Sequence, residues 1–177
     1  MSILALFNKK VFHGSPSNVK NPEYNRNRGW TEMGPGFYTT QDLEYSVMLA
    51  EWRSGPNVPY FINHYEYDDE LAEKLHYKIK KFNLDEEWLQ YLIDSYKGVS
   101  KRYDIVEGPT ADDNVRILIE KYVDEYPNGD RRAFSELLEF LKIHVNTTQI
   151  HFQSQRAIDN CLKYTGADEY RDVRRRV

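Results

Sequence analysis

The sequence lacks several features that would assign it to a common class of protein. Cys161 is the only cysteine among 177 residues, so neither an intrachain disulfide nor a cysteine-based zinc site can form. Its neighbours are typical of a helix face, which predicts a buried and unreactive thiol. No apolar run approaches the length of a membrane span, and residues 1–7 are too short for a signal-peptide core. We therefore expect a cytoplasmic protein with no membrane partner.

The sequence also lacks an excess of positive charge. Its formal net charge of -4 argues against a broad nucleic-acid surface, because such a surface depends on cations that neutralise phosphates. The exception is a basic tail, which we place at residues 165–177. No GxxxxGK[ST], GxGxxG or HExxH pattern occurs, which removes the common nucleotide-triphosphate, Rossmann and zinc-hydrolase interpretations. We predict no metal site.

The pattern of residues present predicts a single α+β domain over residues 1–177. Hydrophobic residues make up 40% of the chain and no linker or repeat divides it. Strands are expected at 10–13, 36–40, 60–67, 75–82, 103–106 and 149–152. Helices are expected after Asp42, from Asp85, after Asp112 or Asp113, over 133–144 and around 157–162. The strands and helices follow no regular βαβ alternation, which favours α+β over a doubly wound fold.

Two segments place a polar ring beside glycines at the end of a short apolar run, an arrangement that suits a nucleotide cleft. They are Val11-Phe12-His13-Gly14-Ser15 and Gly34-Pro35-Gly36-Phe37-Tyr38-Thr39-Thr40. Strand alternation puts Phe37 and Tyr38 on opposite faces, and we assign the core to Phe37 and the cleft to Tyr38. Taken alone, His13 would be read as a structural histidine and Tyr38 as core packing.

Four motifs in order resemble a bacterial family of ADP-ribosyltransferase-like proteins, within the superfamily of diphtheria toxin and the poly(ADP-ribose) polymerases. They are His13-Gly14-Ser15, Gly34 to Thr40, Tyr103 to Asp113 with its Gly108-Pro109-Thr110-Ala111-Asp112-Asp113, and Gln149 to Phe152. The resemblance covers about residues 10 to 164. It implies two small sheets packed at a steep angle, flanked by helices, with NAD in the cleft between them.

The resemblance also implies roles for individual residues. His13, Tyr38 and Gln149 would be the catalytic signature, in which His13 binds the adenine-side ribose, Tyr38 stacks on nicotinamide and Gln149 holds the nicotinamide ribose. The NAD-binding set would be Gly14, Ser15, Arg28, Gly36, Leu49 and Asp113, with Arg26 beside Arg28 in the loop of residues 15–31.

Three positions depart from the pattern or stay open. Gln149 stands where relatives usually have a carboxylate, and an amide cannot stabilise a cation by charge. Leu49 falls where polymerase-type relatives have a second aromatic ring, with Trp52 one turn later. Asp112 and Asp113 are explained by helix capping, although one of them could act as a base. His151 either lines the cleft beside Gln149 or is a surface neighbour.

These observations predict a mono-ADP-ribosyltransferase or NAD glycohydrolase with NAD as co-substrate. The acceptor is a protein, a nucleic acid or a nucleotide. Relatives that act as toxins or in phage defence suggest a neutralising protein partner. The alternative is a non-catalytic module that binds ADP-ribose, NAD or a protein on the same fold. A metal-free ribonuclease that pairs His13 with His144 or His151 ranks lower, because no lysine pattern accompanies these residues.

Overall fold

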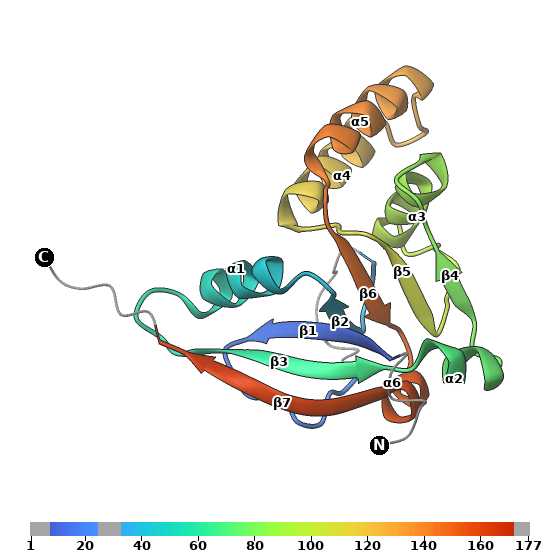
Figure 1. Ribbon diagram of the computed structural model, residues 1–177. Coiled ribbons are helices and arrows are strands. Elements are labelled where there is room, and N and C mark those ends of the chain that lie inside the picture. The colour runs from blue at the N-terminus through green and yellow to red at the C-terminus, as the bar shows by residue number, and fades with distance from the viewer. Residues whose placement is uncertain (1–7, 25–32, 172–177) are drawn as a thin grey trace, which may run out of the picture.

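The computed structural model describes residues 8–24 and 33–171, which form an α+β fold with a seven-stranded mixed sheet and six helices in this part of the chain (Figure 1). The strands are β1 (Lys9–Ser15), β2 (Phe37–Thr40), β3 (Tyr60–Tyr67), β4 (Ile79–Lys81), β5 (Ile105–Pro109), β6 (Thr148–Phe152) and β7 (Leu162–Tyr170). The helices are α1 (Leu43–Ser54), α2 (Asp69–Lys74), α3 (Glu86–Tyr96), α4 (Asp113–Glu125), α5 (Arg131–His144) and α6 (Gln155–Cys161). The predicted α+β class is confirmed.

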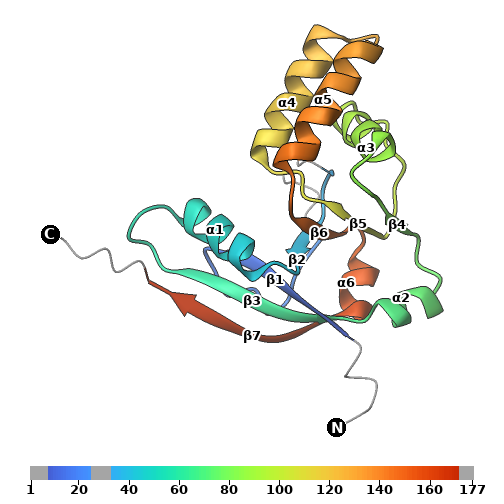
Figure 2. The ribbon, with the colours of Figure 1, turned by 45° about the horizontal axis from the view of Figure 1, so that its top comes forward.

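The strands form one continuous sheet, which corrects the expectation of two small packed sheets. Its order is β4-β5-β6-β2-β1-β3-β7, and only β4 and β5 run parallel. Strand β1 pairs with β3 at seven positions but with β2 at a single one, Phe12 with Thr40. The sheet is therefore two halves joined by this short ladder. Figures 1 and 2 show β6 and β5 running steeply across the direction of β1, β3 and β7.

The two faces of the sheet carry separate cores. Helices α3, α4 and α5 cover the face of β5 that presents Val106, with Trp88 and Ile119 buried there. Helix α6 and the short α2 cover the opposite face, where Phe37 and Phe152 are buried. Phe37 is therefore core and Tyr38 points to the other face, as the alternation along β2 predicts.

Aspartates begin the helices at the predicted places. Asp42 accepts from the Tyr45 N–H before α1, and Asp85 accepts from two N–H groups before α3. Asp112, not Asp113, is the N-cap of α4, where its Oδ1 accepts from Asn114 and Val115 N–H. Each carboxylate satisfies donors that the first helical turn leaves unpaired.

Two regions differ from the prediction. The strand expected over 75–82 is only β4, because residues 69–74 form α2 and His76 takes a positive φ of 55°. Residues 162–170 form β7 beside β3, so the basic tail does not begin at residue 165. Residues 172–177 of that tail lie outside the described residues.

Two further expectations concern the thiol and the membrane. Cys161 is buried at the end of α6, and burial raises the pKa of its thiol to about 11, which disfavours a nucleophilic role. In the part of the chain that the structure describes, no helix has both the length and the apolar character needed to cross a membrane.

Candidate functional site

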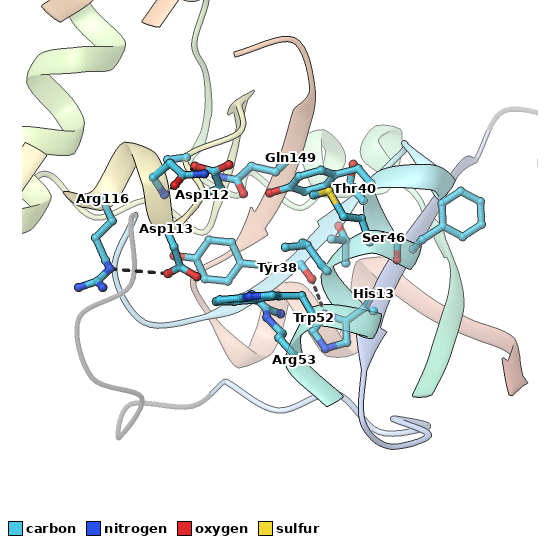
Figure 3. A pocket seen from close by; sticks show the side chains of 18 residues that line it. His13, Tyr38, Thr40, Ser46, Trp52, Arg53, Asp112, Asp113, Arg116 and Gln149 are labelled. Atoms are coloured by element: carbon cyan, nitrogen blue, oxygen red, sulfur yellow. Dashed lines mark hydrogen bonds and ion pairs between the residues drawn. The ribbon is translucent and has the colours of Figure 1, made fainter. Parts of the chain in front are cut away.

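A cavity of about 580 Å³ lies where α1 and the start of α4 flank the junction of β1, β2 and β6. We call it the sheet cavity. Its lining residues are Phe12, His13, Gly14, Tyr38, Thr39, Thr40, Tyr45, Ser46, Met48, Leu49, Trp52, Arg53, Ala111, Asp112, Asp113, Asn114, Arg116 and Gln149. Figure 3 shows Gln149 and His13 on opposite sides of Tyr38, and Asp112, Asp113 and Arg116 together at one end. The volume is within the usual range for small-molecule sites.

Most of the predicted site residues meet in this cavity. Those that line it are His13, Gly14, Tyr38, Leu49, Asp112, Asp113 and Gln149. Ser15, Gly36 and His151 are buried outside its lining. His144 lies exposed at the end of α5 and does not line the cavity, which removes its pairing with His13. Arg26 and Arg28 lie outside the described residues.

Tyr38 is held rigidly. Its hydroxyl donates to the Gly34 carbonyl at 2.8 Å and accepts from the Met33 N–H at 3.1 Å. The His151 ring stacks on the Tyr38 ring with a centroid distance of 3.9 Å and an interplanar angle of 12°. The two residues are cross-strand partners in β2 and β6. An aromatic ring fixed at its hydroxyl and stacked from behind is a preorganised platform for a planar ligand.

His151 is a structural residue behind this platform. It is completely buried, and Gln153 Nε2 donates to its Nδ1 at 3.2 Å. Burial lowers the pKa of His151 to about 3, against a smaller opposing effect of the Pro35 backbone. The imidazole is therefore neutral at pH 7, and His151 is not among the residues that line the sheet cavity.

Gly36 is needed by the protein itself. A Cβ atom at Gly36 would lie 2.2 Å from His151 Nε2 and 2.4 Å from the Phe152 carbonyl oxygen. The space beside Gly36, which the resemblance assigns to NAD, is therefore filled by the imidazole of His151. Similarly, a Cβ at Gly14 would lie 2.2 Å from the Ser46 carbonyl oxygen, so Gly14 lets α1 pack closely on β1.

His13 approaches the cavity from the opposite face of the sheet. Phe12 pairs with Thr40, so strand alternation puts the Phe12 and Tyr38 side chains on one face and His13 on the other. The His13 ring packs on Phe37 at a centroid distance of 4.4 Å, and its Nδ1 lies 2.7 Å from the Tyr38 carbonyl oxygen. Because a carbonyl oxygen only accepts, Nδ1 of His13 is the donor in this hydrogen bond.

Gln149 occupies the other side of the platform. It is 6% exposed, and its Nε2 lies 3.5 Å from Met33 Sδ. A thioether is a weak acceptor, so this contact orients the amide without satisfying it fully. Gln149 can donate or accept a hydrogen bond here, but it brings no charge.

Charge in the sheet cavity is balanced. Asp112 and Asp113 at the start of α4 are matched by Arg53 and Arg116, and Arg116 Nε lies 3.6 Å from Asp113 Oδ1. Arg116 also pairs with Glu120 at 3.0 Å. No group of three or more metal-ligating side chains suited to a metal ion occurs among the residues that the structure describes.

In α1, sequence reasoning assigned Leu49 to the site and noted Trp52 one turn later, but it missed Ser46, Met48 and Arg53, which also line the cavity. Trp52 is 65% exposed although it lines the cavity, as does Met48. Ser46 Oγ is buried and has no hydrogen-bond partner in the described residues. Apolar residues on the outer side of a helix are a signal of ligand binding. The sequence alone does not show that Met48 and Trp52 are exposed, because their exposure depends on the orientation of α1.

The fold and this cavity define an α+β protein with one bent sheet and a ligand-sized site at the bend. The chain belongs to the family described as "Protein of unknown function (DUF3990)", whose model matches residues 9–164, from the start of β1 into β7. No curated protein and no solved structure matches the chain.

Proposed function

We propose that this protein is an NAD-dependent mono-ADP-ribosyltransferase that binds NAD in the sheet cavity. One observation carries the proposal. The signature residues that the sequence resemblance selects, His13, Tyr38 and Gln149, come from three distant segments and line one cavity with Gly14.

Tyr38 provides the platform for nicotinamide. Its ring lines the cavity while His151 covers it from behind, so a planar cation packing there gains both stacking and cation–π attraction. Trp52 supplies the second aromatic surface that Leu49 does not. Because Trp52 lies on α1, one turn beyond Leu49, the two rings come from different elements of the same cavity.

His13 and Gln149 would hold the two riboses. His13 Nε2 would form a hydrogen bond with a hydroxyl of one ribose, and the Gln149 amide would form one with the nicotinamide ribose. The bond from the anomeric carbon to nicotinamide breaks, and its electron pair leaves with nicotinamide. The acceptor nucleophile then bonds the anomeric carbon and loses its proton. Asp113, which lines the cavity, would accept that proton.

An uncharged Gln149 favours single transfer or NAD hydrolysis over polymer elongation. Without a carboxylate, catalysis depends on positioning and on preorganised dipoles. The acceptor is a protein, a nucleic acid or a nucleotide, and a protein that neutralises the enzyme is a proposed partner.

A non-catalytic ADP-ribose-binding module is the second candidate. The observation in its favour concerns the two carboxylates that line the cavity. Both come from the start of α4, where Asp112 caps the helix and Asp113 pairs with Arg116. This module would bind NAD or ADP-ribose and release no nicotinamide.

The test is nicotinamide release from NAD by the purified protein, with NAD binding measured by calorimetry. We expect Tyr38→Ala and Gln149→Ala to lower release about 100-fold, as for the loss of one transition-state contact. The matched control is Gln90→Ala, on the exposed face of α3, which should release nicotinamide at the wild-type rate. Binding without release would select the binding module, and the absence of both would overturn the two proposals together.

A further inference from the structure

A second cavity of about 580 Å³ lies beyond the ends of β4 and β5, beside α6. We call it the basic cavity. Its lining residues are Tyr24, Met33, Gly34, Pro35, Lys78, Ser95, Gly98, Ser100, Lys101, Arg102, Tyr103, Asp104, Gln153, Ser154 and Arg156. It is formed mostly by the connections around α3, β4 and β5, and it shares no lining residue with the sheet cavity.

The basic cavity concentrates positive charge in a protein of net charge -4. Lys78, Lys101 and Arg102 form no ion pair within the described residues, although all three line the cavity. Three unpaired cations around one concavity repel each other, and the arrangement favours an anion that neutralises them.

One carboxylate in this cavity is already fully engaged. Asp104 is buried, and it accepts from Arg156 through both oxygens at 3.0 and 2.9 Å. It also accepts from the Lys78 N–H and the Ser154 hydroxyl. Asp104 therefore fixes Arg156 and the Lys78 backbone as a rigid edge of the cavity and leaves the charges of the other three cations uncompensated.

The lining also contains groups that suit a nucleotide. Tyr103 presents a half-buried aromatic ring, and Ser100 adds a hydroxyl. Cations beside an aromatic surface are the usual arrangement for binding single-stranded nucleic acid, in which phosphates pair with the cations and a base stacks on the ring.

The basic cavity is physically connected to the sheet cavity. Met33 and Gly34 line the basic cavity, and both bond the hydroxyl of Tyr38. Gln153 lines the basic cavity and bonds His151, which stacks on Tyr38. A ligand in the basic cavity therefore lies one layer of residues from the Tyr38 platform.

We propose that the basic cavity binds the phosphate group of a nucleotide, either free or within a single-stranded oligonucleotide. Lys78, Lys101 and Arg102 bind the phosphate, and Tyr103 stacks on the base. This site is separate from the sheet cavity and does not rest on ADP-ribosyl transfer.

The test is fluorescence anisotropy of a labelled single-stranded hexanucleotide, with AMP and inorganic phosphate as competitors. The triple variant Lys78→Gln/Lys101→Gln/Arg102→Gln should bind at least tenfold more weakly. Its salt dependence should fall by about 2 in the slope of log K against log salt, at about 0.7 for each lost contact on a single strand. Competition by AMP identifies a nucleotide site, and failure of AMP to compete identifies a site that requires an oligonucleotide.

Two controls separate this site from general electrostatics and from the sheet cavity. Lys74→Gln/Lys121→Gln/Lys142→Gln removes the same charge from α2, α4 and α5, outside the basic cavity, and should retain wild-type binding. Trp52→Ala alters only the sheet cavity and should also retain it. No binding by the wild type, competition by inorganic phosphate as strong as by AMP, or equal loss in the two triple variants would overturn the proposal.

Discussion

The sheet cavity and the basic cavity have the same volume but are built differently. Strands and two helices line the first, its signature side chains are mostly buried, and its two carboxylates match its two guanidiniums. Connections between elements line much of the second, with four cations against one carboxylate. Strands fix side chains more precisely than loops do, whereas loops tolerate exposed charge. The sheet cavity is therefore suited to positioning a ligand, and the basic cavity is suited to binding a negatively charged one.

At neutral pH, the largest effect of a single substitution on stability should come from adding one methyl group to each cavity. Gly14→Ala would put Cβ 2.2 Å from the Ser46 carbonyl oxygen, which must displace α1 and should lower the free energy of unfolding by about 3 kcal/mol. Gly98→Ala meets no atom within 4 Å, but its φ of 73° is strained, and it should lower that free energy by about 1 kcal/mol.

Urea unfolding of the two glycine variants measures this difference. Equal costs in the two cavities would contradict the view that one is built from tightly packed elements and the other from loops.

Acid should destabilise the two cavities in different ranges of pH. His151 behind Tyr38 has a folded pKa of about 3, below the unfolded value of 6.5, so the unfolded chain binds the extra proton. The contribution of His151 to the free energy of unfolding is complete above pH 6.5 and falls by about 1.4 kcal/mol per pH unit as pH drops towards 3.

At the basic cavity, Arg156, the Lys78 N–H and Ser154 together lower the pKa of Asp104 despite its burial. The stabilisation by Asp104 is therefore lost only below its ordinary value of 3.8.

Stability curves of wild type and His151→Phe between pH 4 and 7 test the first range. The variant keeps an aromatic ring under Tyr38 but has no imidazole to protonate. The slope of its free energy of unfolding against pH should therefore be smaller by up to the contribution of one proton. Identical slopes in the two proteins would show that His151 does not titrate on unfolding.

The smallest effect on stability should come from Trp52→Ala. Because Trp52 is 65% exposed, the change in the free energy of unfolding should stay within about 0.5 kcal/mol. Loss of a stacking surface worth about 1 kcal/mol should raise the Kd for NAD about fivefold, as measured by calorimetry. Ile143→Ala, at a 78% exposed position of α5, is the matched control. An unchanged Kd in the tryptophan variant would remove Trp52 from the site.

Local signals predicted much of the fold. The capping aspartates and the alternation of Phe37 and Tyr38 depend on neighbours in sequence, and the structure confirms them. Strand β7 was missed because its solvent-exposed residues and Gly166 give no apolar alternation; pairing with β3 decides its conformation. The strand expected over 75–82 was too long because Asp68 caps α2 and the chain turns at residue 76.

The sheet cavity was partly predictable because short motifs mark its strands. The exceptions show where motifs fail. Gly36 was assigned to a ligand, but it accommodates His151, a contact between strands that are far apart in sequence. The basic cavity was not predicted because Lys78, Lys101 and Arg156 come from separate segments, and only the fold brings them around one concavity.

The order of the strands also constrains when the chain can fold during synthesis. Strands β2 and β3 each depend on a neighbour from residues 148–170, β6 and β7 respectively. At about 5–20 residues per second, a ribosome needs on the order of ten seconds to pass from β2 to β6. Throughout that interval the nascent chain carries two unpaired strand edges, which are templates for association with other chains. The two edges are therefore open to association with other chains until residues 148–170 have been synthesised.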